Sequence, residues 1–316
     1  MFIESDAFKG CVGITEFKGK FASADGCCLI VDGVLNSFAS ECGILEYNIP
    51  NCVTTIGERA FFGCKHLTSI AIPSSVKRIE NRAFKYCSSL LNISIPDSIT
   101  YIGERAFAFC DSLTDISFSQ SVKIIEKEIF MGCKSLVSIV IPNSVATIED
   151  GAFQECASLT SLTIPDGVNS IGASTFMGCC NLVNVTIPLS VTSIKANSFR
   201  GCYSLVNITI PDEVTEIDML AFNGCKSLTI ITIPDRVTTI EDGAFKNCTS
   251  LTNLTIGNSV SKIGREAFNN CNIDTIVCYP KVPPKLNNSF DKFENLIIPT
   301  GCEQAYANSN WGKYLE

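Results

Sequence analysis

Cysteine is the residue type in this chain whose number first suggests chemistry, because 18 of the 316 residues are cysteines. Thiols can pair as disulfides or bind zinc, but a zinc site needs closely spaced pairs such as C-x₂-C, and the adjacent pairs Cys27-Cys28 and Cys179-Cys180 lack that spacing. Ten of the cysteines instead recur every 23 residues, at Cys64, Cys87, Cys110, Cys133, Cys156, Cys179, Cys202, Cys225, Cys248 and Cys271. We therefore expect no metal site, and we interpret the ten as buried, reduced thiols that act as small apolar residues.

Disulfides between successive repeats are the alternative, since neighbouring coils of a repetitive fold lie within bridging distance. Such bridges would make the repeats pair off and would break their symmetry. The eight remaining cysteines follow no regular spacing: Cys11, Cys27, Cys28, Cys42, Cys52, Cys180, Cys278 and Cys302.

The other residues that could catalyse a reaction also look structural. His66 is the only histidine, and it occupies a position where other repeats have small polar residues such as Ser89 and Asn181, which indicates an exposed turn. The carboxylate pairs Glu149-Asp150 and Glu241-Asp242 recur at one repeat position, as a solvated flank would. A general base needs a partner that orients it, and no nucleophile, metalloprotease or phosphate-loop motif occurs. We expect a protein that is not an enzyme and takes no cofactor.

Composition narrows the possible partners. The formal net charge is −8, with 24 basic residues and no basic run, which argues against nucleic acid or an anionic membrane surface. No stretch approaches 18 uninterrupted apolar residues, so we expect no membrane insertion.

The repeat unit itself is clear in Leu67–Cys87, LTSIAIPSSVKRIENRAFKYC. Alternation around Ile70 predicts a short strand with one buried side. Pro73 should end that strand, because proline has no N–H to donate, and small polar residues after it favour a turn. The Ala-Phe-x-x-Cys segment, with a phenylalanine three residues before each column cysteine, should close the coil as a short helical or 3₁₀ turn.

One unit cannot bury enough apolar surface to fold alone, so the units must stack. A 23-residue period headed by Leu-x-x-Ile-x-Ile predicts a leucine-rich-repeat solenoid of parallel strands, of the α/β class, with rungs roughly 4.8 Å apart.

The spacing of the repeats divides the chain into three segments, which we expect to form one continuous domain. Residues 1–43 hold a partial repeat ending at Cys11 and an irregular repeat, in which Asp25-Gly26 and Asp32-Gly33 around an apolar run predict a hairpin. Residues 44–271 are the regular array. Residues 272–316 should form the C-terminal cap that a solenoid requires, with the single tryptophan, Trp311, packed inside it.

The unit I-P-x-x-V-x-x-I-x-x-x-A-F-x-x-C-x-x-L resembles the BspA-like leucine-rich repeats over nearly all of residues 44–316. The resemblance extends to the terminal Ile298–Trp311 segment, and residues 20–39 resemble the irregular N-terminal repeat of such proteins. It implies a secreted or cell-surface protein that acts in adhesion or protein binding.

The outward strand positions are the remaining candidates for function. They form a polar, nearly uncharged strip, which costs little to desolvate when its groups are paired. We predict partner binding at Asn184, Thr186, Asn207, Thr209, Ile230, Thr232, Asn253 and Thr255, with Ile230 as an apolar anchor and an extracellular protein or glycan as the partner. Three of these asparagines begin Asn-x-Thr sequons. The alternative is a structural spacer with no ligand, in which threonine simply suits an exposed strand.

Overall fold

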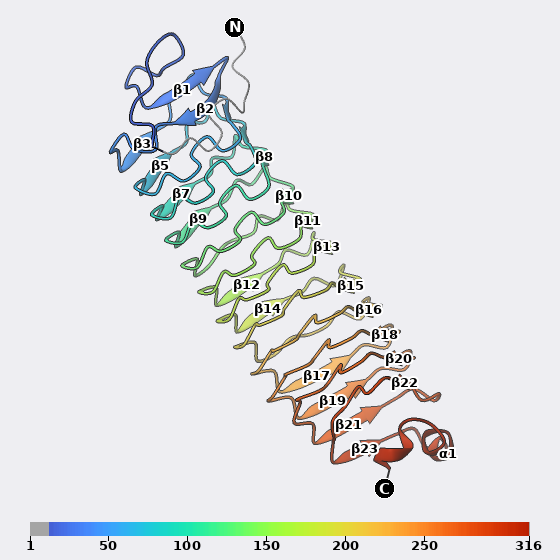
Figure 1. Ribbon diagram of the computed structural model, residues 1–316. Coiled ribbons are helices and arrows are strands. Elements are labelled where there is room, and N and C mark those ends of the chain that lie inside the picture. The colour runs from blue at the N-terminus through green and yellow to red at the C-terminus, as the bar shows by residue number, and fades with distance from the viewer. Residues whose placement is uncertain (1–12, 316) are drawn as a thin grey trace. The chain divides into compact units, whose positions relative to one another are not determined.

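The computed structural model describes residues 13–315, so the predicted partial repeat that ends at Cys11 lies outside the described residues. The chain divides into two compact units, unit 1 up to Leu159 and unit 2 from Thr160. Each unit is built from solenoid coils (Figure 1). Most coils carry two strands, but the first of the two is absent at residues 138–140 and 207–209. The prediction of a parallel-strand leucine-rich-repeat solenoid is confirmed. The prediction that the three sequence segments form one domain stays a prediction.

Unit 1 begins with the predicted hairpin, β1 (Cys28–Val31) paired antiparallel with β2 (Val34–Phe38). Its turn is Asp32-Gly33, and both residues have positive φ, 48° and 77°. That is the conformation of a type I′ turn, whose twist matches the twist of paired strands. A parallel strand follows directly on β2, so the hairpin opens the second strand column of unit 1.

The coils of unit 1 contribute two columns of parallel strands. The first column comprises β3 (Glu46–Asn48), β5 (Ser69–Ala71), β7 (Asn92–Ser94) and β9 (Asp115–Ser117). The second comprises β4 (Thr55–Ile56), β6 (Arg78–Ile79), β8 (Tyr101–Ile102), β10 (Ile124–Ile125) and β11 (Thr147–Ile148).

Unit 2 repeats this arrangement and adds the cap. Its first column comprises β12 (Ser161–Thr163), β14 (Asn184–Thr186), β17 (Ile230–Ile233), β19 (Asn253–Ile256), β21 (Thr275–Cys278) and β23 (Asn295–Ile297). Its second comprises β13 (Ser170–Ile171), β15 (Ser193–Ile194), β16 (Glu216–Ile217), β18 (Thr239–Ile240), β20 (Lys262–Ile263) and β22 (Lys285–Leu286).

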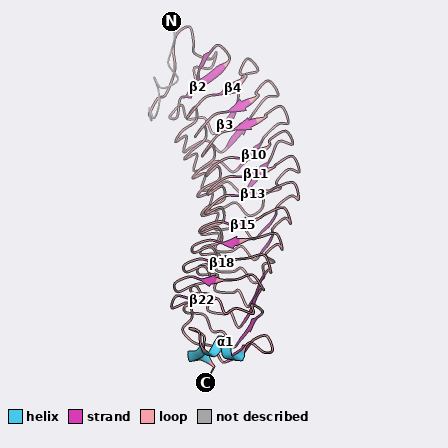
Figure 2. Ribbon diagram, turned by 90° about the vertical axis from the view of Figure 1, so that its right-hand side faces the viewer, coloured by secondary structure: helices cyan, strands magenta, loops and turns pink. Residues whose placement is uncertain are grey.

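The cap holds the helices of the described chain, α1 (Glu303–Ala307) and the 3₁₀ turn Gly312–Tyr314 (Figure 2). Trp311 lies between them with no exposed surface, and its Nε1 donates to the Pro284 carbonyl at 2.8 Å. Its ring contacts Phe290 at a centroid distance of 5.6 Å. The predicted packing role of this tryptophan is therefore confirmed.

The Ala-Phe-x-x-Cys segment closes each coil as successive β-turns rather than as a helix. Hydrogen bonds run from residue i+3 to residue i, as from the Cys87 N–H to the Phe84 carbonyl at 3.1 Å. Arg82 and Tyr86 on either side of Phe84 have positive φ, 58° and 66°. Because left-handed residues interrupt helical propagation, these turns stay single and the solenoid contains little helix.

The column cysteines have a specific bonding role in the core. The Cys110 thiol donates to the carbonyl of Phe84 in the preceding coil at 3.2 Å, and the same contact recurs along the column. Cys110 is buried without exposed surface, and burial raises its pKa well above the usual range. The thiol thus satisfies a buried carbonyl as a protonated donor, which an alanine could not do. Eight column members are free thiols in the structure: Cys64, Cys87, Cys110, Cys133, Cys202, Cys225, Cys248 and Cys271.

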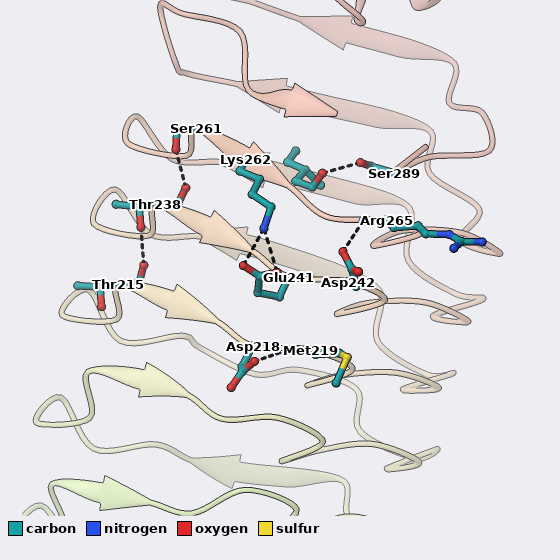
Figure 3. A network of polar contacts seen from close by, with 11 residues as sticks. Thr215, Asp218, Met219, Thr238, Glu241, Asp242, Ser261, Lys262, Arg265 and Ser289 are labelled. Atoms are coloured by element: carbon teal, nitrogen blue, oxygen red, sulfur yellow. Dashed lines mark hydrogen bonds and ion pairs between the residues drawn. The ribbon is translucent and has the colours of Figure 1, made fainter. Parts of the chain in front are cut away.

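Polar side chains also join successive coils on the solvent side of unit 2. The Thr238 hydroxyl donates to the Thr215 carbonyl at 3.2 Å, and Ser261 repeats this contact one coil further on (Figure 3). Beside them, Lys262 Nζ lies 3.0 Å from a Glu241 carboxylate oxygen. These contacts keep the second strand column of unit 2 in register.

Candidate functional site

The predicted partner-binding residues all lie in unit 2, on its first strand column. Asn184 and Thr186 flank the buried Val185 on β14, and Ile230 and Thr232 flank the buried Ile231 on β17. Asn253 and Thr255 lie on β19 in register with Ile230 and Thr232, with Thr255 half-buried and the others exposed. The outward orientation predicted for these side chains is correct.

The structure differs from the prediction at the rung between β14 and β17. Residues 207–209 were expected to form a strand like their neighbours, but Asn207–Ile210 is irregular and pairs with neither strand. Ile208, the inward residue of this rung, is only half-buried, whereas the corresponding Val185 and Ile231 are buried. Among the described residues, the main-chain N–H and C=O groups of this segment form no main-chain hydrogen bond.

The opening is local to the strand side of these two coils. At the turn side, the Phe199 N–H donates to the Ala221 carbonyl and the Gly201 N–H donates to the Asn223 carbonyl, each at 2.8 Å. The second column also continues, because β15, β16 and β18 pair in sequence. Because the two coils stay hydrogen-bonded at the turn side and along the second strand column, they can separate only along the first strand column, where the opening lies.

The opening forms a hollow of about 380 Å³. We call it the strand-gap groove; its lining residues are Asn207, Ile208, Thr209, Ile210, Asp212, Ile230, Thr232 and Pro234. Four of the eight predicted binding residues therefore meet at one site, namely Asn207, Thr209, Ile230 and Thr232. Asn184 and Thr186 lie beyond its β14 side, and Asn253 and Thr255 lie beyond β17.

The groove combines an apolar anchor with neutral polar groups. Ile230 is 55% exposed and is the one large apolar residue among the outward positions predicted to bind a partner. Asp212 is the charged residue of its lining, and the neighbouring Glu213 is paired with Arg236. Unpaired main-chain groups beside an exposed isoleucine can bind a segment that supplies hydrogen bonds and an apolar side chain together.

A larger hollow, of about 540 Å³, is lined by the last regular coil and the cap, and its lining includes Val260, Pro280, Val282 and Lys285. None of the predicted binding residues lines it. Sequence reasoning missed this hollow because Pro280, Val282 and Lys285 belong to the irregular last repeat, where no column identifies an outward position.

None of the residues first considered for catalysis lines either hollow. His66 is exposed, and its Nε2 lies 3.6 Å from a Glu41 carboxylate oxygen. Within residues 13–315, no cluster of three or more histidine, cysteine or acidic side chains could hold a metal ion. No helix in that range is long and apolar enough to cross a membrane.

Comparison with known proteins identifies the repeats. The sequence pattern of the BspA type leucine rich repeat region, in six copies, matches residues 35–159, 110–229 and 169–297. The chain belongs to this family. Leucine-rich-repeat solenoids are in general non-catalytic binding proteins. A search of curated proteins finds no match to this BspA-type chain.

Three solved bacterial structures are similar to this chain. A leucine-rich repeat protein from Bacteroides ovatus is 27% identical, with a TM-score of 0.48, over 83% of this chain and 87% of its own. A leucine rich cell surface protein from Faecalibacterium prausnitzii is 24% identical, with a TM-score of 0.44, over 92% and 98%. The pneumococcal vaccine antigen PcpA is 19% identical, with a TM-score of 0.54, over 92% and 80%, which shows a shared fold.

Proposed function

We propose that this BspA-type chain is a non-catalytic binding module, secreted or displayed on a bacterial surface, that binds an extracellular protein through the strand-gap groove. The single observation that carries the proposal is the unpaired main chain of Asn207–Ile210 next to the exposed Ile230. An extended segment of a partner could exchange hydrogen bonds with this main chain at the surface of the groove. The cell-surface description of the Faecalibacterium protein supports the location.

Specificity would come from the outward side chains. Thr209 and Thr232 point to the same face and can donate or accept hydrogen bonds without desolvating a charge. Ile230 would enter an apolar depression of the partner, as a central anchor does. Asn184 and Asn253, on the flanking strands, would lie at the rim, where contacts contribute less.

The test is binding to purified extracellular matrix proteins, immobilised one at a time, by the parent chain and by the variants Thr209→Lys and Thr232→Lys. Each lysine adds a charge and a long side chain to the groove. Thr163→Lys is the matched control, because Thr163 is an exposed outward threonine on β12, outside the groove. We expect the groove variants to weaken binding at least about tenfold, or 1.4 kcal/mol, and the control to match the parent.

Intact circular dichroism and unchanged melting must accompany each variant. If Thr163→Lys loses as much binding as the groove variants, the added charge weakens binding wherever on this face it is placed. Unchanged binding by both groove variants would exclude this site. Binding to glycans but to no protein would replace the proposed partner class, and the absence of any binding would favour the spacer alternative.

A further inference from the structure

Unit 1 carries a second surface that the strand-gap groove does not involve. Phe62, Tyr86 and Phe109 lie at the turn edge of three successive coils, and their rings touch in sequence. The Phe62 and Tyr86 centroids are 5.4 Å apart and nearly perpendicular, and the Tyr86 and Phe109 rings stack at 5.0 Å. We call these three residues the aromatic row. Tyr86 is 39% exposed, so the row reaches solvent.

Two members of the row have an unfavourable backbone conformation. Tyr86 and Phe109 precede column cysteines at a position that is left-handed throughout the solenoid, with φ of 66° and 60°. The same position holds glycine in the coils on either side, Gly63 and Gly132. Left-handed backbone suits glycine and disfavours bulky side chains. Glycine closes the adjacent coils, so the turn itself needs no ring at this position, which in later coils also holds Glu155, Asn247 and Asn270.

The row is accompanied by cationic side chains. Lys85 Nζ lies 4.8 Å from the Tyr86 ring centroid and 5.4 Å from that of Phe109. Arg82 and Arg105 lie nearby and are engaged, the first with Glu58 at 3.4 Å and the second with Glu128 at 2.6 Å.

Lys85 differs from these arginines because, in the described part of the chain, it forms no ion pair with a carboxylate. Its pKa is lowered, first by desolvation and then by the charges of Arg105 and Arg82. A partly desolvated ammonium among other cations, over two rings, is a site that an anion would stabilise.

We propose that the aromatic row and Lys85 bind an acidic oligosaccharide, in which C–H groups of the sugar rings lie against the aromatic side chains and a hexuronate carboxylate pairs with Lys85. Three rings over three coils offer contacts to successive units of one sugar chain. Glu58 and Glu128 beside the row would repel a dense polyanion such as a nucleic acid, whereas a sugar chain carries its carboxylates further apart. This site is independent of the protein partner proposed for unit 2.

Glycine substitution makes a clean test, because it removes the ring and relieves the left-handed strain. The variants Tyr86→Gly and Phe109→Gly should melt near the parent temperature, because relief of the left-handed strain offsets the lost ring contacts. Lys85→Gln removes the charge and retains most of the stem. The matched control is Tyr203→Ala in unit 2, an exposed tyrosine with Lys226 Nζ 4.6 Å from its ring but without a row of neighbouring rings.

The probe is tri-galacturonic acid, titrated against the full chain by calorimetry, with maltotriose as the neutral comparison. We expect the parent to bind the acidic trisaccharide more tightly than maltotriose and more weakly at higher ionic strength. Tyr86→Gly and Phe109→Gly should each weaken binding about tenfold or more, Lys85→Gln should abolish the preference for the acid, and Tyr203→Ala should match the parent.

The proposal is overturned if the parent fails to bind the acidic trisaccharide, or binds it no better than maltotriose. It is also overturned if both glycine variants bind like the parent, or if they melt well below it, because the rings would then serve folding alone. Preferential binding of an acidic peptide would assign the surface to a protein partner instead.

Discussion

Truncation of one ring in the phenylalanine column tests how the coils hold together, and Phe222→Ala is the best-placed substitution in unit 2. Phe222 has no exposed surface, and it stacks on Phe199 at 5.2 Å and on Phe245 at 5.0 Å, with interplanar angles of 2° and 9°. Replacing a buried phenylalanine by alanine costs about 3–5 kcal/mol, of which each lost ring pair accounts for about 0.5–1.5 kcal/mol. The coils on both sides stay fixed by their own hydrogen bonds, so the cavity cannot collapse and the upper half of the range applies.

The assay is urea unfolding followed by far-ultraviolet circular dichroism, with Tyr203→Ala as the control because that ring is 49% exposed. The slope against urea must be compared as well, since a weakened interface in a repeat protein can uncouple one part of the array from the rest. A lower slope would show that unfolding has become stepwise at the altered coil. A loss below about 1 kcal/mol, or one equal to that of the control, would refute the inward stacking as a main source of stability.

Two further predictions concern the thiols and the ion pairs. A chromogenic thiol reagent should count all 18 cysteines in the unreduced, unfolded chain, and a lower total in that sample would demonstrate disulfides. In the native chain, the exposed Cys52 should react while the buried column cysteines stay protected. Arg105 lowers the pKa of Glu128 below its reference of 4.5, so the pair stabilises the fold above that pH and its contribution is lost as the pH falls through the lower, folded-state value. Glu128→Gln should therefore cost about 1 kcal/mol at pH 7, with the difference from the parent shrinking as the pH falls below 4.5 in pH-dependent melting. A pH-independent difference would contradict this reasoning.

The sequence by itself determined the solenoid and the direction in which each side chain of a coil points. A 23-residue period places the same residue type at the same position of every coil, so each buried column is visible as a repeated letter. The hairpin was also predictable, because Asp32-Gly33 is a dipeptide that accepts positive φ at both positions. In the cap, Trp311 could be assigned to packing because the last coil of a solenoid must be covered.

Only the tertiary structure decided where the regular pattern is interrupted and which exposed side chains meet. Residues 207–210 read Asn-Ile-Thr-Ile, as regular as the strands beside them, and the opening of that rung depends on how whole coils separate. No short stretch of sequence predicts such a separation, because the separation is the sum of small shifts over many contacts. The aromatic row is hidden for a related reason: Phe62 occupies a different repeat position from Tyr86 and Phe109, and only the left-handed turns bring their rings, 23 residues or more apart, into contact.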